Sequence, residues 1–216
     1  MSTKAVIFDL DGTLLNTLED IAGAVNHALG LLGLPLHTVE EFKYFVGNGT
    51  DIMLKRALPA DRRDDGTLET IKPLYVSYYD KHSDDNTRPY DGIFELLSNL
   101  KAREIKLAVT SNKIDCMVDL IVKNYFADTF DYVTGQSDGV PPKPDITMVK
   151  KAMDSLSVLP SECIYVGDSG VDAKTGKNVG AFTVGVKWGF RPESELLDNG
   201  ADVVISQPIE LLKYLK

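Results

Sequence analysis

Two aspartates lie one residue apart where the first apolar run ends, in Phe8-Asp9-Leu10-Asp11-Gly12-Thr13. An Asp-Gly pair alone is typical of a turn, because both residues tolerate turn conformations of the backbone. The functional alternative is a pair of carboxylates at the carboxyl end of a buried strand, where open α/β sheets bind their ligands. Polar residues at other strand ends decide between the two.

Two later apolar runs also end in polar residues, namely Ser111-Asn112 and Gly167-Asp168-Ser169 with Asp172. Each set could simply cap a helix, since Asp, Ser and Asn are favoured at N-caps. Lys143 lies in Pro141-Pro142-Lys143-Pro144, where the prolines restrict it to an extended segment. A lone loop lysine is normally only solvated. Four such signals along one chain nevertheless favour a shared site.

The combined residues indicate a metal site. Asp9, Asp11, Asp168 and Asp172 would place up to four negative charges in one crevice, opposed by Lys143. Their repulsion would raise the pKa values, and a hard divalent cation with oxygen ligands would relieve it. We expect Mg²⁺, because few carboxylates completed by water and phosphate oxygens suit it better than Ca²⁺. No histidine lies near these motifs, which disfavours zinc.

A cation beside carboxylates, a lysine and hydroxyl donors is suited to phosphoryl transfer, in which catalysis is mostly positioning and charge stabilisation. One aspartate can act as the nucleophile, because an ordinary pKa of about 3.9 leaves it ionised at neutral pH without a base. The other must give a proton to the leaving oxygen and then take one from water. That role requires a pKa raised by acidic neighbours.

Short apolar runs alternate with helical patterns, which is typical of an α/β fold. The runs are nearly all apolar, so we expect a doubly wound parallel sheet covered on both faces. A flavodoxin-like order would place the first strand centrally and bring the polar strand ends together. The predicted strands are Ala5-Asp9, Ile105-Ser111, Tyr132-Gly135, Cys163-Asp168, Thr183-Lys187 and Asp202-Ser206, and the predicted crossover helices are Ile93-Arg103, Ile114-Asn124, Ile146-Ser157 and Val171-Val179.

Almost a hundred residues separate the first predicted strand from the second, far more than one crossover helix needs. Most of this stretch has helical patterns, over Leu18-Leu32, toward Phe45, and over Asp51-Leu58 and Leu68-Lys81. We therefore predict an α/β core of residues 1–15 and 84–216, with a helical cap domain of residues 16–83 inserted after the first strand. The turn in residues 87–92 would return the chain to the core.

Composition excludes several classes of function. The 216 residues carry a net charge of −9, the wrong sign for binding nucleic-acid phosphates. No apolar run approaches the ~20 residues that span a bilayer, and the N-terminus lacks a signal-peptide pattern. Cys116 and Cys163 have neither paired nor metal-ligand spacing, so we expect reduced thiols packed in the core of a cytoplasmic protein. The expected partner is a small phosphorylated metabolite, and the oligomeric state is left open.

Taken in order, Asp9-Leu10-Asp11-Gly12-Thr13, Ser111, Lys143-Pro144 and Gly167-Asp168-Ser169 with Asp172 resemble the four motifs of the haloacid dehalogenase-like superfamily, in its phosphatase branch. The helical insert is similar to the C1-type cap of that family. Further segments resemble the phosphoglycolate phosphatase-like group, namely residues 46–49, 88–92, 186–190 and 200–205.

The resemblance implies that Asp9 is the nucleophile and forms an aspartyl-phosphate. Asp11 would be the general acid and afterwards the base. Ser111, the Asn112 amide and Lys143 would bind the phosphoryl oxygens.

The resemblance also implies that Mg²⁺ is bound by the Asp9 side chain, the Asp11 backbone carbonyl and Asp168, with Asp172 orienting these ligands. The loop around Gly47-Asn48-Gly49 would close over the site, exclude water and contact the leaving group.

Three positions depart from the family pattern. Ile146 stands where a second proline often follows the third motif, and Asn16 where aspartate is usual. Gly176 stands where alanine is more typical, at a cost of about 1 kcal/mol in helix stability. None of these removes a group that the chemistry requires.

The expected function is Mg²⁺-dependent hydrolysis of small, phosphoglycolate-like phosphate monoesters. A phosphomutase or a pyrophosphatase would use the same core, although related mutases carry a histidine at the place of Ile21. A phospho-accepting signalling protein needs no cap and carries its aspartate after the third strand, and a binder without turnover would not need both carboxylates. Arg56 or Lys43 could meet a substrate carboxylate from the cap, but a solvated helix face is the commoner role.

Overall fold

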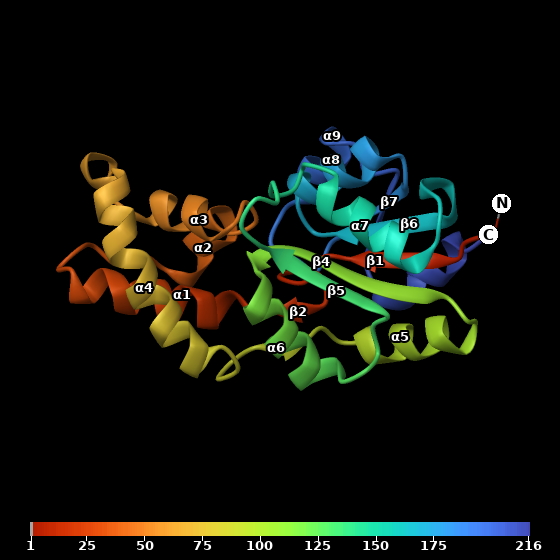
Figure 1. The fold of residues 1–216 in the computed structure, drawn as a ribbon, viewed down its shortest axis with the longest axis horizontal. Coiled ribbons are helices and arrows are strands. Elements are labelled where there is room, and N and C mark those ends of the chain that lie inside the picture. The colour runs from red at the N-terminus through yellow and green to blue at the C-terminus, as the bar shows by residue number, and fades with distance from the viewer. Residues whose placement is uncertain (1) are drawn as a thin grey trace.

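The computed structural model describes residues 2–216. Six strands form one parallel sheet in the order β5-β4-β1-β6-β7-β8. Helices cover both faces, with α5 and α6 on one side and α7 and α8 on the other (Figure 1). The expected doubly wound α/β class is confirmed. The strands are β1 (Ala5–Phe8), β4 (Lys106–Ile114), β5 (Tyr132–Gln136), β6 (Cys163–Gly167), β7 (Phe182–Val186) and β8 (Val203–Ile205), and the helices are α5 (Ile93–Ala102), α6 (Asp115–Phe126), α7 (Thr147–Leu156), α8 (Gly170–Val179) and α9 (Glu193–Asp198).

The strand order differs from the expected flavodoxin-like order. β1 pairs directly with both β4 and β6, with Ala5 opposite Lys106 on one side and Cys163 on the other. This is the order of dinucleotide-binding folds, in which the chain reverses direction across the sheet beside the first strand. Both orders bury the first strand on both faces, so its apolar run could not distinguish them. The observed order brings the ends of β1 and β6 side by side at the reversal point.

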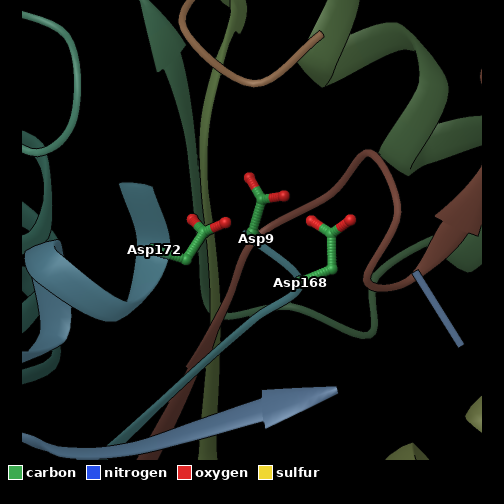
Figure 2. Close-up of side chains that lie close together, drawn as sticks. All are labelled: Asp9, Asp168 and Asp172. Atoms are coloured by element: carbon green, nitrogen blue, oxygen red, sulfur yellow. The ribbon is translucent and has the colours of Figure 1, made fainter. Parts of the chain in front are cut away.

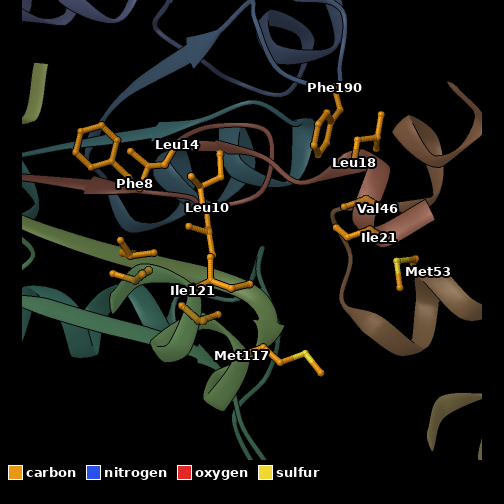
Figure 3. Packing of buried hydrophobic residues seen from close by; sticks show 14 of the residues in the cluster. Phe8, Leu10, Leu14, Leu18, Ile21, Val46, Met53, Met117, Ile121 and Phe190 are labelled. Atoms are coloured by element: carbon orange, nitrogen blue, oxygen red, sulfur yellow. The ribbon is translucent and has the colours of Figure 1, made fainter. Parts of the chain in front are cut away.

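The core follows from the alternation of side chains along buried strands. In β1, Val6 and Phe8 face the larger apolar cluster, whereas Ala5 and Ile7 face the smaller one, which lies against α7. The larger cluster continues past the sheet into the helical insert, where it includes Ile21 (Figure 3). The sheet and the insert therefore share one apolar interior.

The insert after β1 consists of α1 (Leu18–Leu31), α2 (Val39–Phe45), α3 (Thr50–Ala57) and α4 (Asp65–His82), which lie together beyond the carboxyl edge of the sheet (Figure 1). The chain leaves the core through β2 (Leu15–Asn16) and returns through β3 (Arg88–Pro89), and these two pair antiparallel. Asp20 in α1 fastens the returning segment, because its Oδ2 accepts hydrogen bonds of 2.8 Å from both the backbone N and Oγ1 of Thr87. No helix in residues 2–216 is long and apolar enough to cross a membrane.

Some expectations about single residues are wrong. Cys116 is exposed, whereas Cys163 is buried in β6 as expected. Strand β4 continues past its predicted end at Ser111 as far as Ile114, with an irregularity in its pairing to β5. Gly176 does more than weaken α8, because an added Cβ would overlap the side chain of Thr183. Glycine here lets α8 approach β7 closely.

Candidate active site

A pocket lies where the carboxyl ends of the strands meet the helical insert. All seven predicted site residues line it. Its lining comprises Asp9, Asp11, Ser111, Asn112, Lys113, Lys143, Asp168, Ser169, Asp172, Phe190 and Arg191 from the core, and Ile21, Val46, Gly47, Gly49, Thr50, Met53 and Tyr75 from the insert.

Asp9 directly follows β1, and its backbone N donates to the Val166 carbonyl at 2.9 Å, which continues the ladder with β6. Lys143 Nζ donates to Asp9 Oδ1 at 2.6 Å. Burial nevertheless raises the pKa of Asp9 to about 7, with the charges of Asp172 and Asp11 adding to it and Lys143 opposing it. The rise in pKa expected from neighbouring acids is therefore present at Asp9, whereas the ordinary pKa expected for the nucleophile is wrong.

Three buried carboxylates converge. One oxygen from each of Asp9, Asp168 and Asp172 lies within 4.8 Å of the others. Figure 2 shows the three groups pointing to the same side, from the ends of β1 and β6 and the first turn of α8. Burial raises the pKa of Asp168 well above its ordinary value, and Asp172 and Asp9 raise it further. The backbone gives Asp168 space, because a Cβ at Gly12 would overlap its carboxylate.

The three carboxylates have different partners, and this decides where a cation fits. Asp172 accepts from Lys143 Nζ at 2.8 Å and from Ser169 Oγ at 2.5 Å. Asp168 accepts at Oδ2 from the backbone N of Phe190 at 2.7 Å, and no ion pair in residues 2–216 includes it. Lys143 thus offsets part of the charge of Asp9 and Asp172, whereas the Phe190 hydrogen bond and the charge of Arg191 oppose the rise in the pKa of Asp168 without cancelling it. The oxygen donors of Asp9 and Asp168 therefore fit a hard divalent cation.

Lys143 is fixed more tightly than its loop position predicts. Its side chain is 2% exposed, and besides the two aspartates its Nζ donates to the Thr110 carbonyl at 3.0 Å and to Tyr165 Oη at 3.2 Å. Burial by itself would lower the pKa of Lys143, but Asp172 and Asp9 raise it well above its ordinary value. The lysine is therefore a fixed positive charge at the base of the pocket.

Ser111 and Asn112 lie where the sequence predicts, at the pocket end of β4. Ser111 Oγ accepts from the backbone N of Lys113 at 3.2 Å. The Asn112 side chain has a structural role, since its Oδ1 accepts from the Lys143 backbone N at 2.7 Å and its Nδ2 donates to the Gly47 carbonyl at 3.0 Å. Asn112 thus joins β4 to the lysine loop and to the insert.

Sequence reasoning missed Lys113, whose Nζ lies 3.1 Å from Asp11 Oδ1. The Lys113 side chain is 4% exposed, and its Nζ lies 4.4 Å from the centre of the Tyr79 ring in α4. Asp11 also accepts from Thr17 Oγ1 at 2.7 Å. The predicted strand ended at Ser111, so the sequence placed Lys113 in a loop. The available signal was its position immediately after the second motif.

The insert contributes a loop to the pocket wall, but Arg56 and Lys43, the two basic side chains considered for substrate binding, do not line the pocket. The loop residues Gly47 and Gly49 do line it. Arg56 Nη2 donates to Asn48 Oδ1 at 2.8 Å and so holds the loop from within the insert. Lys43 pairs with Glu40 at 2.8 Å on the surface. The surface role favoured by the sequence holds for Lys43.

The fold and this site define a class. The model of the haloacid dehalogenase-like hydrolase family matches residues 6–186, and the chain belongs to that family. It is 31% identical to the phosphoglycolate phosphatase of Nitrosospira multiformis over 99% of this chain and 96% of the relative. It is 29% identical to the N-acetylmuramic acid 6-phosphate phosphatase of Pseudomonas aeruginosa over 100% of this chain and 96% of the relative.

A crystal structure of a candidate phosphoglycolate phosphatase from Lactobacillus delbrueckii subsp. bulgaricus superposes with a TM-score of 0.92. It is 31% identical in sequence, and the match covers 98% of this chain and 97% of the other. Within its family, the chain is thus similar to phosphoglycolate phosphatases. The predicted family and group are confirmed.

Proposed function

We propose that this protein is a Mg²⁺-dependent phosphatase that hydrolyses small phosphate monoesters of the phosphoglycolate type through an aspartyl-phosphate on Asp9. The observation that carries the proposal is the convergence of Asp9, Asp168 and Lys143, all buried, at the reversal point of the sheet. The names of the relatives support the same reaction class.

Asp9 acts as the nucleophile. Its carboxylate attacks the phosphorus atom, the bond to the ester oxygen breaks, and the phosphoryl group is held on Asp9. Lys143 and Ser111, which line the same pocket, bind the phosphoryl oxygens together with the backbone amide of Asn112. The lysine is already fixed by its other bonds, so it loses little freedom when substrate binds.

Asp11 moves the protons. It gives one to the ester oxygen as the alcohol leaves and takes one from the water that attacks the aspartyl-phosphate. Thr17 and Lys113 hold its carboxylate in the pocket. This exchange regenerates both aspartates and releases inorganic phosphate.

Asp9, Asp168 and the backbone carbonyl of Asp11 would hold Mg²⁺, and Asp172 would keep these ligands oriented. When bound, the ion supplies positive charge against the phosphoryl oxygens and the carboxylates. Lys143 carries one positive charge and pairs with two carboxylates, Asp9 and Asp172. The ion would offset the negative charge that remains, including the charge of Asp168.

Residues 16–83 form the cap in this proposal. Ile21, Val46 and Met53 give its wall an apolar surface that excludes water from the reacting groups. Ile21 occupies the position at which related mutases carry a histidine, and it lines the pocket. Transfer to water rather than to a second sugar hydroxyl is therefore the favoured outcome.

Phosphate release from a substrate panel tests the proposal. The panel contains phosphoglycolate, glycerol phosphate, hexose phosphates, N-acetylmuramic acid 6-phosphate and pyrophosphate, each with and without MgCl₂. We expect the highest turnover with phosphoglycolate and loss of turnover in Asp9→Asn. That amide keeps the size of the side chain but cannot act as the nucleophile. Undiminished turnover in Asp9→Asn would refute the assignment.

A further inference from the structure

One segment of the insert, residues 44–49, runs from the last residues of α2 into the loop that follows, and we call it the insert loop. It forms part of the pocket wall and is held by the core from two sides. On one side Asn112 Nδ2 donates to the Gly47 carbonyl at 3.0 Å. On the other side Arg191 Nη2 donates to the carbonyls of Val46 at 3.1 Å and Tyr44 at 3.3 Å. All of these acceptors are backbone oxygens, so the contacts depend on where the loop lies and not on its side chains.

Arg191 is placed for this contact by the same segment that supports the acid cluster. The preceding residue, Phe190, donates its backbone N to Asp168. The Arg191 side chain is 9% exposed, and its Nε lies 3.6 Å from Glu195 Oε1. The same Glu195 oxygen accepts from the backbone N of Gly170, at the start of α8, at 3.0 Å. Arg191 is therefore anchored to the core before it reaches the insert.

The insert presents a suitable surface to the guanidinium. Tyr44 and Val46 lie at the carboxyl-terminal end of α2, where backbone carbonyls lack helical partners and accept from guanidinium groups. The Tyr44 carbonyl accepts from Arg56 Nη1 of the insert at 3.2 Å as well as from Arg191 of the core. The guanidinium carbon also lies 5.1 Å from the centre of the Tyr44 ring. Arginine suits this position because its planar group offers several donors and stacks on aromatic rings.

The pocket has two other basic side chains, both lysines, and each forms ion pairs with aspartates of the core. Lys143 pairs with Asp9 and Asp172, and Lys113 pairs with Asp11. Arg191 alone among the three connects the core to the backbone of the insert loop. Its position between the two parts distinguishes it from a residue that only binds phosphate.

We propose that Arg191 is a positioning residue that holds the loop of residues 44–49 against the core and thereby keeps the pocket closed over Asp9. Its effect on turnover rests on the proposed function, whereas its effect on the position of the insert does not. Loss of Arg191 shifts the insert toward open positions. The loop then spends less time in the place where it excludes water and contacts the leaving group.

The position of the insert can be measured directly with spin labels. Glu69→Cys in α4 and Ser155→Cys in α7 place exposed labelling sites on the insert and the core, in a Cys116→Ser background. Cys163 is buried and its thiol pKa is raised to about 12, so it resists labelling. We expect one main distance in the parent protein and a broader distribution extending to longer distances in Arg191→Gln. Arg103→Gln, which removes an exposed arginine at the end of α5, is the matched control and should leave the distribution unchanged.

Turnover provides the second measurement. Arg191→Gln should lower kcat/KM about tenfold, the size of effect expected from losing a charge-assisted hydrogen bond. The loss should be similar for phosphoglycolate and for glycerol phosphate, because the position of the loop and not a contact to a carboxylate has changed. Arg191→Lys keeps the positive charge but can donate to fewer carbonyls at once. We expect its distance distribution and its kcat/KM to lie between those of the parent protein and Arg191→Gln.

Two outcomes overturn the proposal. An unchanged distance distribution in folded Arg191→Gln shows that the arginine does not hold the loop. A loss confined to phosphoglycolate, with the distances unchanged, shows that Arg191 binds the substrate carboxylate instead. If Arg191→Gln does not fold, Arg191→Lys replaces it. A lysine keeps the charge but lacks the planar group that reaches both carbonyls, so an intermediate distance distribution is expected. The parent's distribution in Arg191→Lys would then count against the proposal.

Discussion

Asp9 and Asp168 are buried carboxylates, and the positive charge around them is too small to balance their negative charge. Lys143 forms ion pairs with Asp9 and Asp172, and burial still raises the pKa of Asp9 to about 7. The sequence could place these acids together, because strand ends in a parallel sheet share one edge. It could not give their pKa values, since those depend on how closely the surrounding backbone excludes water.

Asp11 and its proton give a prediction that depends on the leaving group. In Asp11→Asn, kcat/KM for phosphoglycolate should fall by about a hundredfold or more, because its alkoxide leaves poorly without a proton. The kcat/KM for p-nitrophenyl phosphate should fall much less, since its phenolate leaves unprotonated and kcat/KM does not include the later hydrolysis of the aspartyl-phosphate. Steady-state kinetics on both esters make the comparison. Equal losses would remove Asp11 from the role of general acid.

Lys113 gives a second prediction at the same scale. Lys113→Met keeps the length of the side chain over Tyr79 but leaves Asp11 with Thr17 as its side-chain partner. We expect about tenfold slower turnover of phosphoglycolate and a smaller effect on p-nitrophenyl phosphate, because the lysine acts through Asp11. Lys55→Met, which removes an exposed lysine paired with Asp65, is the control. A uniform loss on both esters would indicate a role in phosphate binding instead.

At the scale of elements, periodicity predicted the strands and helices better than their order. The apolar run of β1 indicates a strand buried on both faces, and that prediction is confirmed. The direct pairing of β1 with β6 depends on how α7 crosses the sheet, which no local pattern records. The extension of β4 beyond Ser111 was missed for a related reason. Asn112 and Lys113 are polar because they line the site, so the sequence indicated a loop there.

Two helical glycines test how packing competes with helix propensity. Gly23 in α1 has no atom within 4 Å of an added Cβ, whereas a Cβ at Gly176 in α8 would overlap Thr183. Gly23→Ala should raise the free energy of unfolding by about 0.5–1 kcal/mol. Gly176→Ala should lower it by about 1–3 kcal/mol, because overpacking outweighs propensity. Urea denaturation measures both. A gain in Gly176→Ala would mean that α8 and β7 can separate without cost.

At the scale of the whole molecule, the periodicity of the sequence predicts the helical insert. It does not predict the contacts between the insert and the core. The long gap between the first two strands predicted an insertion, because a single crossover cannot fill it. Arg191 and Asn112 donate hydrogen bonds to backbone oxygens of the insert loop, which lies far from them in the sequence. Such contacts leave no residue pattern, so they emerge only from the folded arrangement.

The last prediction concerns stability and pH. A carboxyl whose folded-state pKa is raised contributes stability that is fully present below its unfolded value, 3.8 for Asp9, and is lost as pH rises through about 7. The metal-free protein should therefore lose this contribution toward neutral pH. Mg²⁺ binds the ionised carboxylates in competition with protons, so its stabilising effect should grow over the same range.

Thermal melts with and without saturating MgCl₂ at about pH 5.5 and about pH 8 measure this difference. We expect several degrees of Mg²⁺-dependent stabilisation at the higher pH and little at the lower one, because protons then occupy the ligands. Asp168→Asn should abolish the difference, since it removes the carboxylate whose charge Lys143 does not offset. Asp198→Asn, at the exposed end of α9, should retain it. Equal stabilisation at both pH values would show that Mg²⁺ binds outside the acid cluster.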